Sequence, residues 1–292
     1  MATHGAFVEQ PLALAALPEG AWRRVRRDPV FLLSGGIVLL FVVVAICASL
    51  IVPQGPTELN PGANYGAPSS EHWFGTDREG RDVFSRVLYG TRMALLGALA
   101  VVAIDLGIGI VYGLLAGYVG GRIDNLLMRA SDILLSFPSL IMAILFVAAF
   151  GPGLTPVVVG LALVYMPTAA RIVRSQVRIQ KAEQYVEAGR ILGFSAPRIA
   201  FRHVLPNCTS QIVVQASIVL PYAIVDLAAL SFLGLGVQPP TPDWGNMLAE
   251  AQKSLILAPW MAIFPALAII LLVLGWNILG ARVRHHLDPT QR

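Results

Sequence analysis

The stretch EQYVEAGRILGFSAPRIAFRHVLPN (183–207) decides the organisation of this chain. It is polar and basic, yet it lies between two long apolar spans near 154–170 and 209–234. A chain embedded in lipid has little reason to keep a Gly- and Pro-punctuated helical hairpin in the water phase unless something docks on it. The stretch therefore predicts both a membrane protein and a partner outside the membrane.

The same stretch predicts two short helices joined by a tight turn. Residues 183–192 form the first helix, and Gly193 is well placed to end it in a left-handed cap. We expect Ser195 to cap a second helix whose first turn contains Pro197. The sequence LPN (205–207) is expected to stop that helix before the next span. A rigid helical hairpin of this kind can transmit a push from a partner, which a flexible loop cannot do.

Apolar spans on both sides of this stretch indicate an all-α polytopic membrane protein. The 292 residues are 56% hydrophobic and only 13% charged, with a mean hydropathy of +0.69, whereas soluble domains carry about a quarter charged residues. Continuous apolar runs of roughly 18 to 25 residues are long enough to cross about 30 Å of hydrocarbon as helices. They lie near 30–52, 93–119, 133–150, 154–170, 209–234 and 258–281. Because the runs do not alternate, they predict six transmembrane helices and exclude a β-barrel.

The distribution of basic residues predicts the orientation. All 21 Lys and Arg lie outside the six spans, and Arg23, Arg24, Arg26 and Arg27 precede the first. Basic residues favour the cytoplasmic side in short loops, so both termini are expected inside. That topology leaves 16 basic residues in the inner segments and five in the outer ones. The net charge of +4 is then an orientation signal and not a nucleic-acid footprint, since no aromatic-interleaved basic patch occurs.

These observations divide the chain into five parts. They are a cytoplasmic tail (1–29), the first membrane helix (30–52), an outward loop (53–92), a core of five membrane helices (93–282) that contains 183–207, and a cytoplasmic tail (283–292). In the outward loop, apolar residues from Val83 to Leu88 recur at helical spacing beside charged ones, which predicts an amphipathic helix at the outer membrane surface. A helix that only caps the bundle fits this pattern as well as a docking helix does.

Two acids, Asp105 and Asp226, lie inside the predicted spans. An acid at that depth costs on the order of 2.5–3.5 kcal/mol, so it usually faces a cavity or a partner. Both are candidate pathway residues. A buried hydrogen bond to a neighbouring helix end is the alternative explanation.

The second span carries a stripe of small residues. Gly109, Gly113 and Gly117 are four residues apart, which places them on one helix face and lets a neighbouring backbone approach closely. We favour packing within the chain over dimerisation as the role of this stripe.

The sequence contains no signature of a catalytic site. It has no G-x-x-x-x-G-K-[ST] loop and so supplies no nucleotide site of its own. Its five His are scattered or lie in the C-terminal tail, and they form no metal-ligand cluster. We therefore expect no enzyme activity, no bound cofactor and no metal.

The central stretch resembles the EAA loop of ABC-importer permeases, on which the cytoplasmic ATPase sits. The shared pattern is EAG (187–189), three further residues, Gly193 and later LP (205–206). Two positions depart from the family pattern: Gly189 replaces an Ala, and His203 replaces an aliphatic residue.

Three further motifs resemble the dipeptide/oligopeptide/nickel class of binding-protein-dependent ABC permeases, specifically its C-type subunit. They are GTDREGRDVFSRVLYGTR (75–92), AGYVGGRIDNLLMRASDILLSFPSL (116–140) and LSFLGLGVQPPTPDWGNML (230–248). The likeness extends over roughly residues 70–285, with Asp226 in place of the more usual Glu.

The resemblance implies a type I-like ABC importer permease in a bacterial cytoplasmic membrane. Implied partners are a homologous second permease, two ATPases that use ATP and Mg, and an extracytoplasmic substrate-binding protein. Coupling to the ATPase would involve Glu187, Ala188, Gly189, Gly193, Ser195, Pro197, Arg198, Phe201, Arg202, His203, Leu205 and Pro206. Asp226 would meet a peptide amine or a basic group of the partner permease.

The expected substrate is a di- or oligopeptide, with a nickel complex or another small solute as the alternative within the family. An ion-coupled secondary transporter would instead use the intramembrane acids and need no ATPase. An intramembrane enzyme would need a nucleophile and a base at matching depth, and the sequence offers no such pair.

Overall fold

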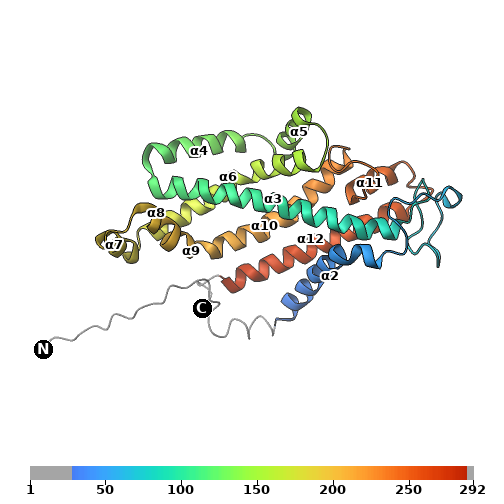
Figure 1. Ribbon diagram of the computed structural model, residues 1–292, viewed down its shortest axis with the longest axis horizontal. Helices are drawn as coiled ribbons and strands as arrows, with labels where there is room; N and C mark the ends of the chain where they lie inside the picture. The colour runs from blue at the N-terminus through green and yellow to red at the C-terminus, as the bar shows by residue number, and fades with distance from the viewer. Residues whose placement is uncertain (1–27, 288–292) are drawn as a thin grey trace.

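The computed structural model describes residues 28–287, and apart from one isolated bridge between Thr76 and Asp82 their regular structure is entirely helical. The tail residues 1–27, with the four arginines preceding the first span, lie outside the described part. The elements are α2 (Pro29–Ile51), η1 (Pro61–Ala63), α3 (Val83–Val119), α4 (Gly121–Leu135), α5 (Ser139–Phe150), α6 (Leu154–Lys181), α7 (Gln184–Ile191), α8 (Ala196–Ile199), the π-helical turn η2 (Ala200–Val204), α9 (Leu205–Asn207), α10 (Thr209–Phe232), α11 (Trp244–Gln252) and α12 (Trp260–Leu287). The long helices form an elongated bundle, with α7 and α8 at one end and the loop after α2 at the other (Figure 1).

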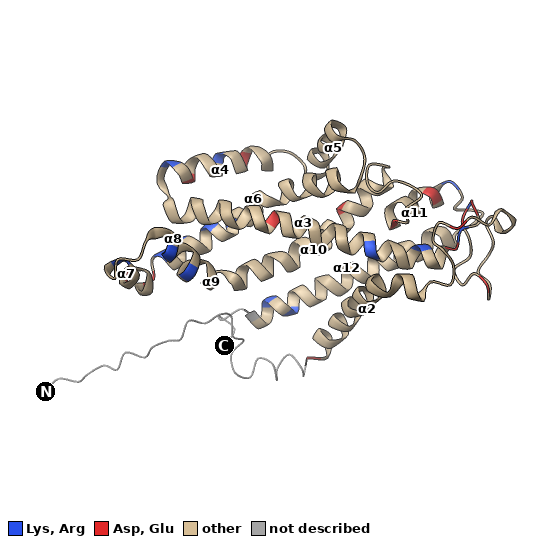
Figure 2. Ribbon diagram, in the orientation of Figure 1, with Lys and Arg blue, Asp and Glu red and all other residues tan. Residues whose placement is uncertain are grey.

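Five helices are long and apolar enough to cross a membrane: α2, α3, α6, α10 and α12. This confirms the all-helical membrane fold. Charged residues are concentrated near the two ends of the bundle and on α4, and few lie on the middle parts of the long helices (Figure 2), which is the distribution that a low-dielectric middle requires.

The prediction of one straight span over 133–150 is wrong. Helices α4 and α5 are bent by 89° at a short break, and they make a sixth span only if the pair is counted as one. The break falls at Ser136–Pro138, where Pro138 lacks an N–H and disfavours helical geometry in the residue before it. Helix α4 also occupies residues 121–132, which lie between two of the predicted spans.

The predicted amphipathic surface helix is instead the beginning of α3. This helix runs without interruption for 37 residues, and Asp82 caps it by accepting a hydrogen bond from the Ser85 N–H at 2.8 Å. Val83, Val87 and even Arg86 are buried in these first turns. The segment therefore caps the bundle and does not lie on the membrane surface as a separate element.

The glycine stripe on α3 packs against α6, as expected. A Cβ on Gly109 would lie 2.8 Å from the Cβ of Ala169, and a Cβ on Gly113 would lie 2.7 Å from that of Val173. Gly117 is equally close to Val177. Residue numbers rise together along both helices, so α3 and α6 run parallel with their backbones in close contact. The stripe serves packing within the chain.

The end of the bundle that the topology prediction places outside, called the outer end below, is closed by residues 53–82 folded onto α3, α11 and α12. Two indoles fix this arrangement: Trp244 donates to the Val87 carbonyl at 2.9 Å, and Trp260 donates to the Thr76 carbonyl at 3.1 Å. Both donors find acceptors in segments far away in the sequence. The outer loop is thereby tied to the helix bundle.

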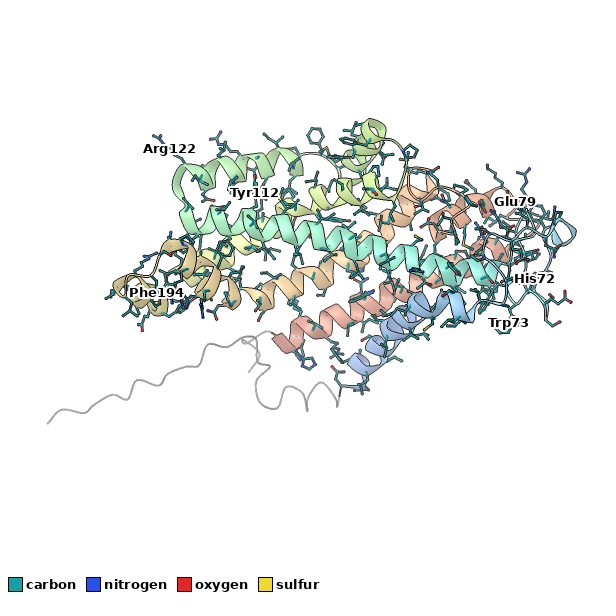
Figure 3. All side chains as sticks on the ribbon, in the orientation of Figure 1. His72, Trp73, Glu79, Tyr112, Arg122 and Phe194 are labelled. Carbon is teal, nitrogen blue, oxygen red and sulfur yellow. The ribbon has the colours of Figure 1, made fainter. Side chains whose placement is uncertain are left out.

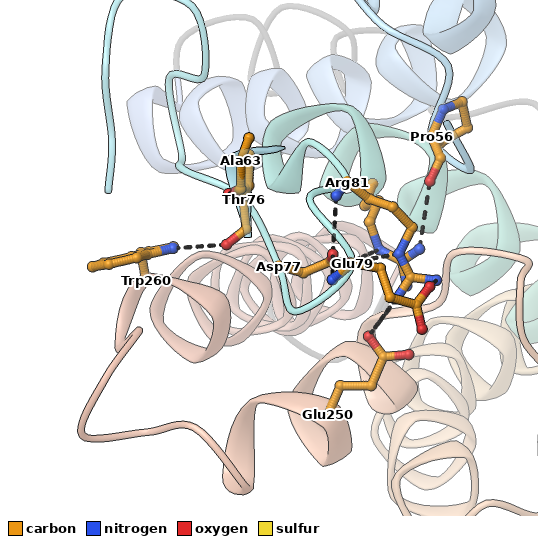
Figure 4. Close-up of polar contacts among 9 residues, drawn as sticks. Pro56, Ala63, Thr76, Asp77, Glu79, Arg81, Glu250 and Trp260 are labelled. Atoms are coloured by element: carbon orange, nitrogen blue, oxygen red, sulfur yellow. Dashed lines mark hydrogen bonds and ion pairs between the residues drawn. The ribbon is translucent and has the colours of Figure 1, made fainter. Parts of the chain in front are cut away.

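A buried ion-pair network completes this closure (Figure 4). Arg81 contacts Asp77 at 2.6 Å and Glu250 of α11 at 3.1 Å, and Arg86 lies 3.5 Å from the same two carboxylates. Burial opposes the charged form of Arg81, but the Asp77 carboxylate outweighs it and raises the pKa of the guanidinium. We call Asp77, Arg81, Arg86 and Glu250 the outer network.

Candidate functional site

The hairpin, residues 184–207, projects from the end of the bundle opposite the outer network (Figure 1). Helix α7 ends as the sequence suggests: Gly193 has a φ of +76°, in the left-handed region. Its N–H donates to the Arg190 carbonyl at 3.0 Å, and the Phe194 N–H donates to the Gly189 carbonyl at 3.0 Å. The turn therefore satisfies the last carbonyls of α7 and fixes the direction of α8.

Two details of the predicted hairpin are wrong. Ser195 occupies the cap position of α8, but its side chain makes no capping hydrogen bond; only its carbonyl accepts, from the Ile199 N–H at 3.0 Å. The sequence LPN does not stop the second helix either, because α8 continues through the π-helical turn and α9 almost directly into α10. Pro206 lies in the first turn of α9, where a missing N–H is tolerated.

The underside of the hairpin is an apolar anchor. Val186, Ile199 and Val204 are each at most 1% exposed. They belong to one buried cluster with Leu114 of α3 and Val177 of α6. Because this packing leaves no room for sliding, a displacement of the hairpin must move the adjacent ends of α3 and α6 with it.

The opposite side of the hairpin faces outward. Exposed residues of the predicted coupling set are Glu187, Ala188, Gly193, Ser195, Pro197, Arg198, Phe201 and Arg202, while His203, Leu205 and Pro206 are half-buried and Gly189 is buried. The structure thus brings these residues together on one projecting element. It gives them two kinds of surroundings, an exposed tip and a packed base.

The most exposed apolar residues of the tip were not predicted from the sequence. Ile191 is 82% exposed and Leu192 is 71% exposed, and Phe201 of the π-helical turn is 56% exposed. Their signal in the sequence was their position just before the Gly193 cap, off the face that carries the buried Val186. An apolar tip rimmed by arginines is a typical docking surface for a protein partner.

Phe194, labelled in Figure 3, stabilises the fold of the hairpin from within. Its ring stacks on His203 with centroids 5.7 Å apart and an angle of 7° between the rings. The Arg198 guanidinium lies 4.2 Å from the Phe194 ring centre. His203 thus has a stacking partner that the usual aliphatic residue would lack, which explains how the departure is accommodated.

The candidate pathway acids lie in the middle of the bundle, on α3 and α10. Asp226 is half-buried and accepts a hydrogen bond from the Tyr165 hydroxyl of α6 at 2.6 Å. Asp105 is 0% exposed, and neither of its carboxylate oxygens has a partner within residues 28–287. Tyr165 was missed at the sequence level, because an isolated tyrosine in an apolar span gives no sign of a partner 61 residues away.

No group of three or more His, Cys, Asp or Glu side chains in the described residues is placed to hold a metal ion. The hairpin presents an exposed apolar tip on a packed base, and the acids form an internal polar site.

Comparisons with known proteins agree with this arrangement. The family model described as "binding-protein-dependent transport system inner membrane component" matches residues 109–292, and the one for the N-terminal TM domain of oligopeptide transport permease C matches residues 19–68. The dipeptide transport system permease protein DppC of Alkalihalophilus pseudofirmus is 40% identical over 93% of this chain and 90% of its own length.

Another relative is the glutathione transport system permease protein GsiD of Pectobacterium atrosepticum, which is 43% identical over 92% of this chain and 89% of its own. Among solved structures, the inward-facing MetNI methionine ABC transporter superposes with a TM-score of 0.55 at 21% identity, over 70% of this chain and 97% of that one. At that identity the likeness concerns the fold alone. Its sequence shows that the chain belongs to the family of binding-protein-dependent transport system inner membrane components, and it is a multi-pass protein of the bacterial inner membrane.

Proposed function

We propose that this chain is one of two permease subunits of an ATP-driven peptide importer, and that its hairpin is the surface on which an ATPase docks. The observation that carries the proposal is the combination of an exposed apolar tip, Ile191 and Leu192, with a fully buried base. A surface that binds without being anchored transmits no force, and an anchored surface without exposed contacts binds nothing. The hairpin has both properties.

The path of force follows from the packing. The base of the hairpin contacts Val173 and Val177 of α6, and these residues pack in turn against Gly113 and Gly117 of α3. A push on α7 and α8 therefore tilts α3 and α6 as one parallel pair. Farther from the hairpin, the same two helices carry Asp105 and Tyr165, so the motion reaches the middle of the bundle.

Peptides are the substrate class that the relatives favour. One similar protein is named for dipeptide transport and the other for glutathione transport, and both names describe peptides. A nickel complex finds no such support. The remaining parts of the assembly are a second permease chain, two ATPases and an external binding protein, with both termini of this chain in the cytoplasm.

Co-purification tests the docking role. We expect Ile191→Asp or Glu187→Lys to reduce recovery of the ATPase with the permease by at least about tenfold, because a charge buried at an interface without a partner is costly. Leu59→Asp is the matched control, since Leu59 is 60% exposed at the other end of the molecule. Full ATPase recovery and peptide uptake with the hairpin variants, at normal membrane levels, would refute the proposal.

The buried acid Asp105 is the one observation that favours a second candidate, an ion-coupled transporter. Transport assays in sealed vesicles distinguish the two functions. An importer driven by ATP stops when ATP is removed and continues with an uncoupler present, whereas an ion-coupled transporter shows the reverse.

A further inference from the structure

Three long helices bring polar side chains together in the interior of the bundle. Tyr165 of α6 donates its hydroxyl hydrogen to Asp226 of α10 at 2.6 Å. Tyr222 lies one helical turn before Asp226 on the same helix. We call Asp105, Tyr165 and Asp226 the acidic site.

The packing of α3 on α6 places Asp105 beside Tyr165. Asp105 is four residues before Gly109 and so lies on the same helix face. Gly109 packs against Ala169, and the two helices run parallel. One turn earlier along both helices, Asp105 meets the segment 162–166, which contains Tyr165.

The two acids of this site differ in access. Asp226 and Tyr165 are half-buried, and Tyr222 beside them is 61% exposed, so the site is open on that side of α10. Asp105 lies behind them, fully buried and without a hydrogen-bond partner within residues 28–287. A polar opening of this kind is unfavourable against lipid and suits a water-filled path between permease chains.

We propose that the acidic site receives the α-ammonium group of a peptide as it passes through the membrane, an inference that rests on the peptide-import function proposed above. An ammonium group carries three donors and needs oxygen acceptors. Asp226 supplies the accessible carboxylate, and Asp105 supplies a second, otherwise unused one. Tyr165 is a positioning residue that holds Asp226 in place from α6.

This arrangement also connects substrate binding to the movement of the hairpin. Asp105 and Tyr165 belong to the α3–α6 pair that the hairpin moves, whereas Asp226 belongs to α10. A tilt of the pair changes the spacing between the two carboxylates. An ammonium group bound between them is held in one state and released in the other.

The test compares alanyl-alanine with propionyl-alanine, which lacks only the amine, in proteoliposomes that contain the whole assembly with its binding protein. The uptake rate of alanyl-alanine divided by that of propionyl-alanine is measured for each permease variant. Because every variant is served by the same binding protein, the preference of that protein cancels when the ratios are compared. We expect Asp226→Asn to lower the ratio at least about tenfold, the effect of losing one hydrogen bond to a charged group.

Asp105→Asn and Tyr165→Phe are also expected to lower the ratio, and Tyr165→Phe should have the smallest effect. Tyr112→Phe is the matched control and should leave the ratio unchanged, because the Tyr112 hydroxyl donates instead to the Leu127 carbonyl of α4 at 2.9 Å. Unchanged ratios in both Asn variants, in assemblies that stay intact on gel filtration, overturn the inference. So does loss of the second permease from these variants, which would show that the acids pair with that subunit. If the unsubstituted assembly imports neither compound, the proposed peptide-import function itself is wrong.

Discussion

The two ends of this molecule are stabilised by different kinds of contact. At the outer end, the charges of Asp77, Arg81 and Arg86 are buried and pair with one another and with Glu250. At the hairpin end, the buried contacts are apolar, and within residues 28–287 none of the hairpin's charged groups is in an ion pair. The buried, paired charges at the outer end stabilise the fold and are not available to a partner. An end whose charges and apolar tip are free has a surface ready for one.

The largest effect is expected from breaking the outer network. Asp77→Ala would remove the more buried of the two carboxylates that the guanidinium groups of Arg81 and Arg86 share, at a cost of about 3–5 kcal/mol. Unfolding of the detergent-solubilised protein by denaturant measures this loss. Glu79→Ala is the control, because that side chain is 54% exposed and its contact with Arg81 is worth about 0–1 kcal/mol. Equal stabilities of the two variants would show that the network contributes nothing.

The next effect concerns the helix pair that joins the two ends. Gly113→Ala places a Cβ 2.7 Å from that of Val173, so α3 and α6 must separate, at a cost of about 1–3 kcal/mol. Gly107→Ala lies on the same helix with no atom within 4 Å of the added Cβ, and it should not destabilise the protein. Thermal unfolding and ATP-driven uptake should both fall for the first variant only. A neutral Gly113→Ala would contradict the close packing of the pair.

In the hairpin, substitutions at the base and at the tip are expected to affect different properties, the stability of the fold and the binding of the ATPase. Val186→Ala removes buried contacts at its base and should cost about 1–3 kcal/mol of unfolding free energy. Ile191→Ala trims a side chain that is 82% exposed and should leave stability within about 0.5 kcal/mol, while weakening ATPase recovery. Denaturant unfolding and co-purification, measured on both variants, give this contrast directly. Loss of stability in Ile191→Ala would mean that the tip is part of the fold.

The smallest effect tests the departure at the EAA-like triplet. Gly189→Ala restores the family residue, and its Cβ would meet Phe194 at 3.5 Å, an ordinary contact. We expect a gain of about 0.4–1 kcal/mol from the lower entropy of the unfolded chain. Gly193→Ala should lose stability instead, since a side chain at a φ of +76° is strained. If both variants behave alike in denaturant unfolding, the turn at Gly193 does not restrain the hairpin.

Much of the hairpin could be predicted from its residues because its geometry is local. The left-handed turn at Gly193 and the helix before it depend on neighbours within a few positions. The missing side-chain cap at Ser195 and the uninterrupted path from α8 into α10 were not predictable in this way. They depend on the packing of Ile199 and Val204 against α3 and α6, which holds the backbone helical past Pro206.

The sequence alone determined the membrane class, the all-helical fold and the position of the exposed hairpin. Lipid offers no hydrogen bonds, so each apolar run of sufficient length must form a helix whatever its neighbours are. Only the tertiary structure decided which side chains meet. The bend between α4 and α5, the burial of Arg86 and the pairing of Tyr165 with Asp226 involve residues that are brought together by helix packing. Because such contacts depend on the register between helices, no local pattern in the sequence encodes them.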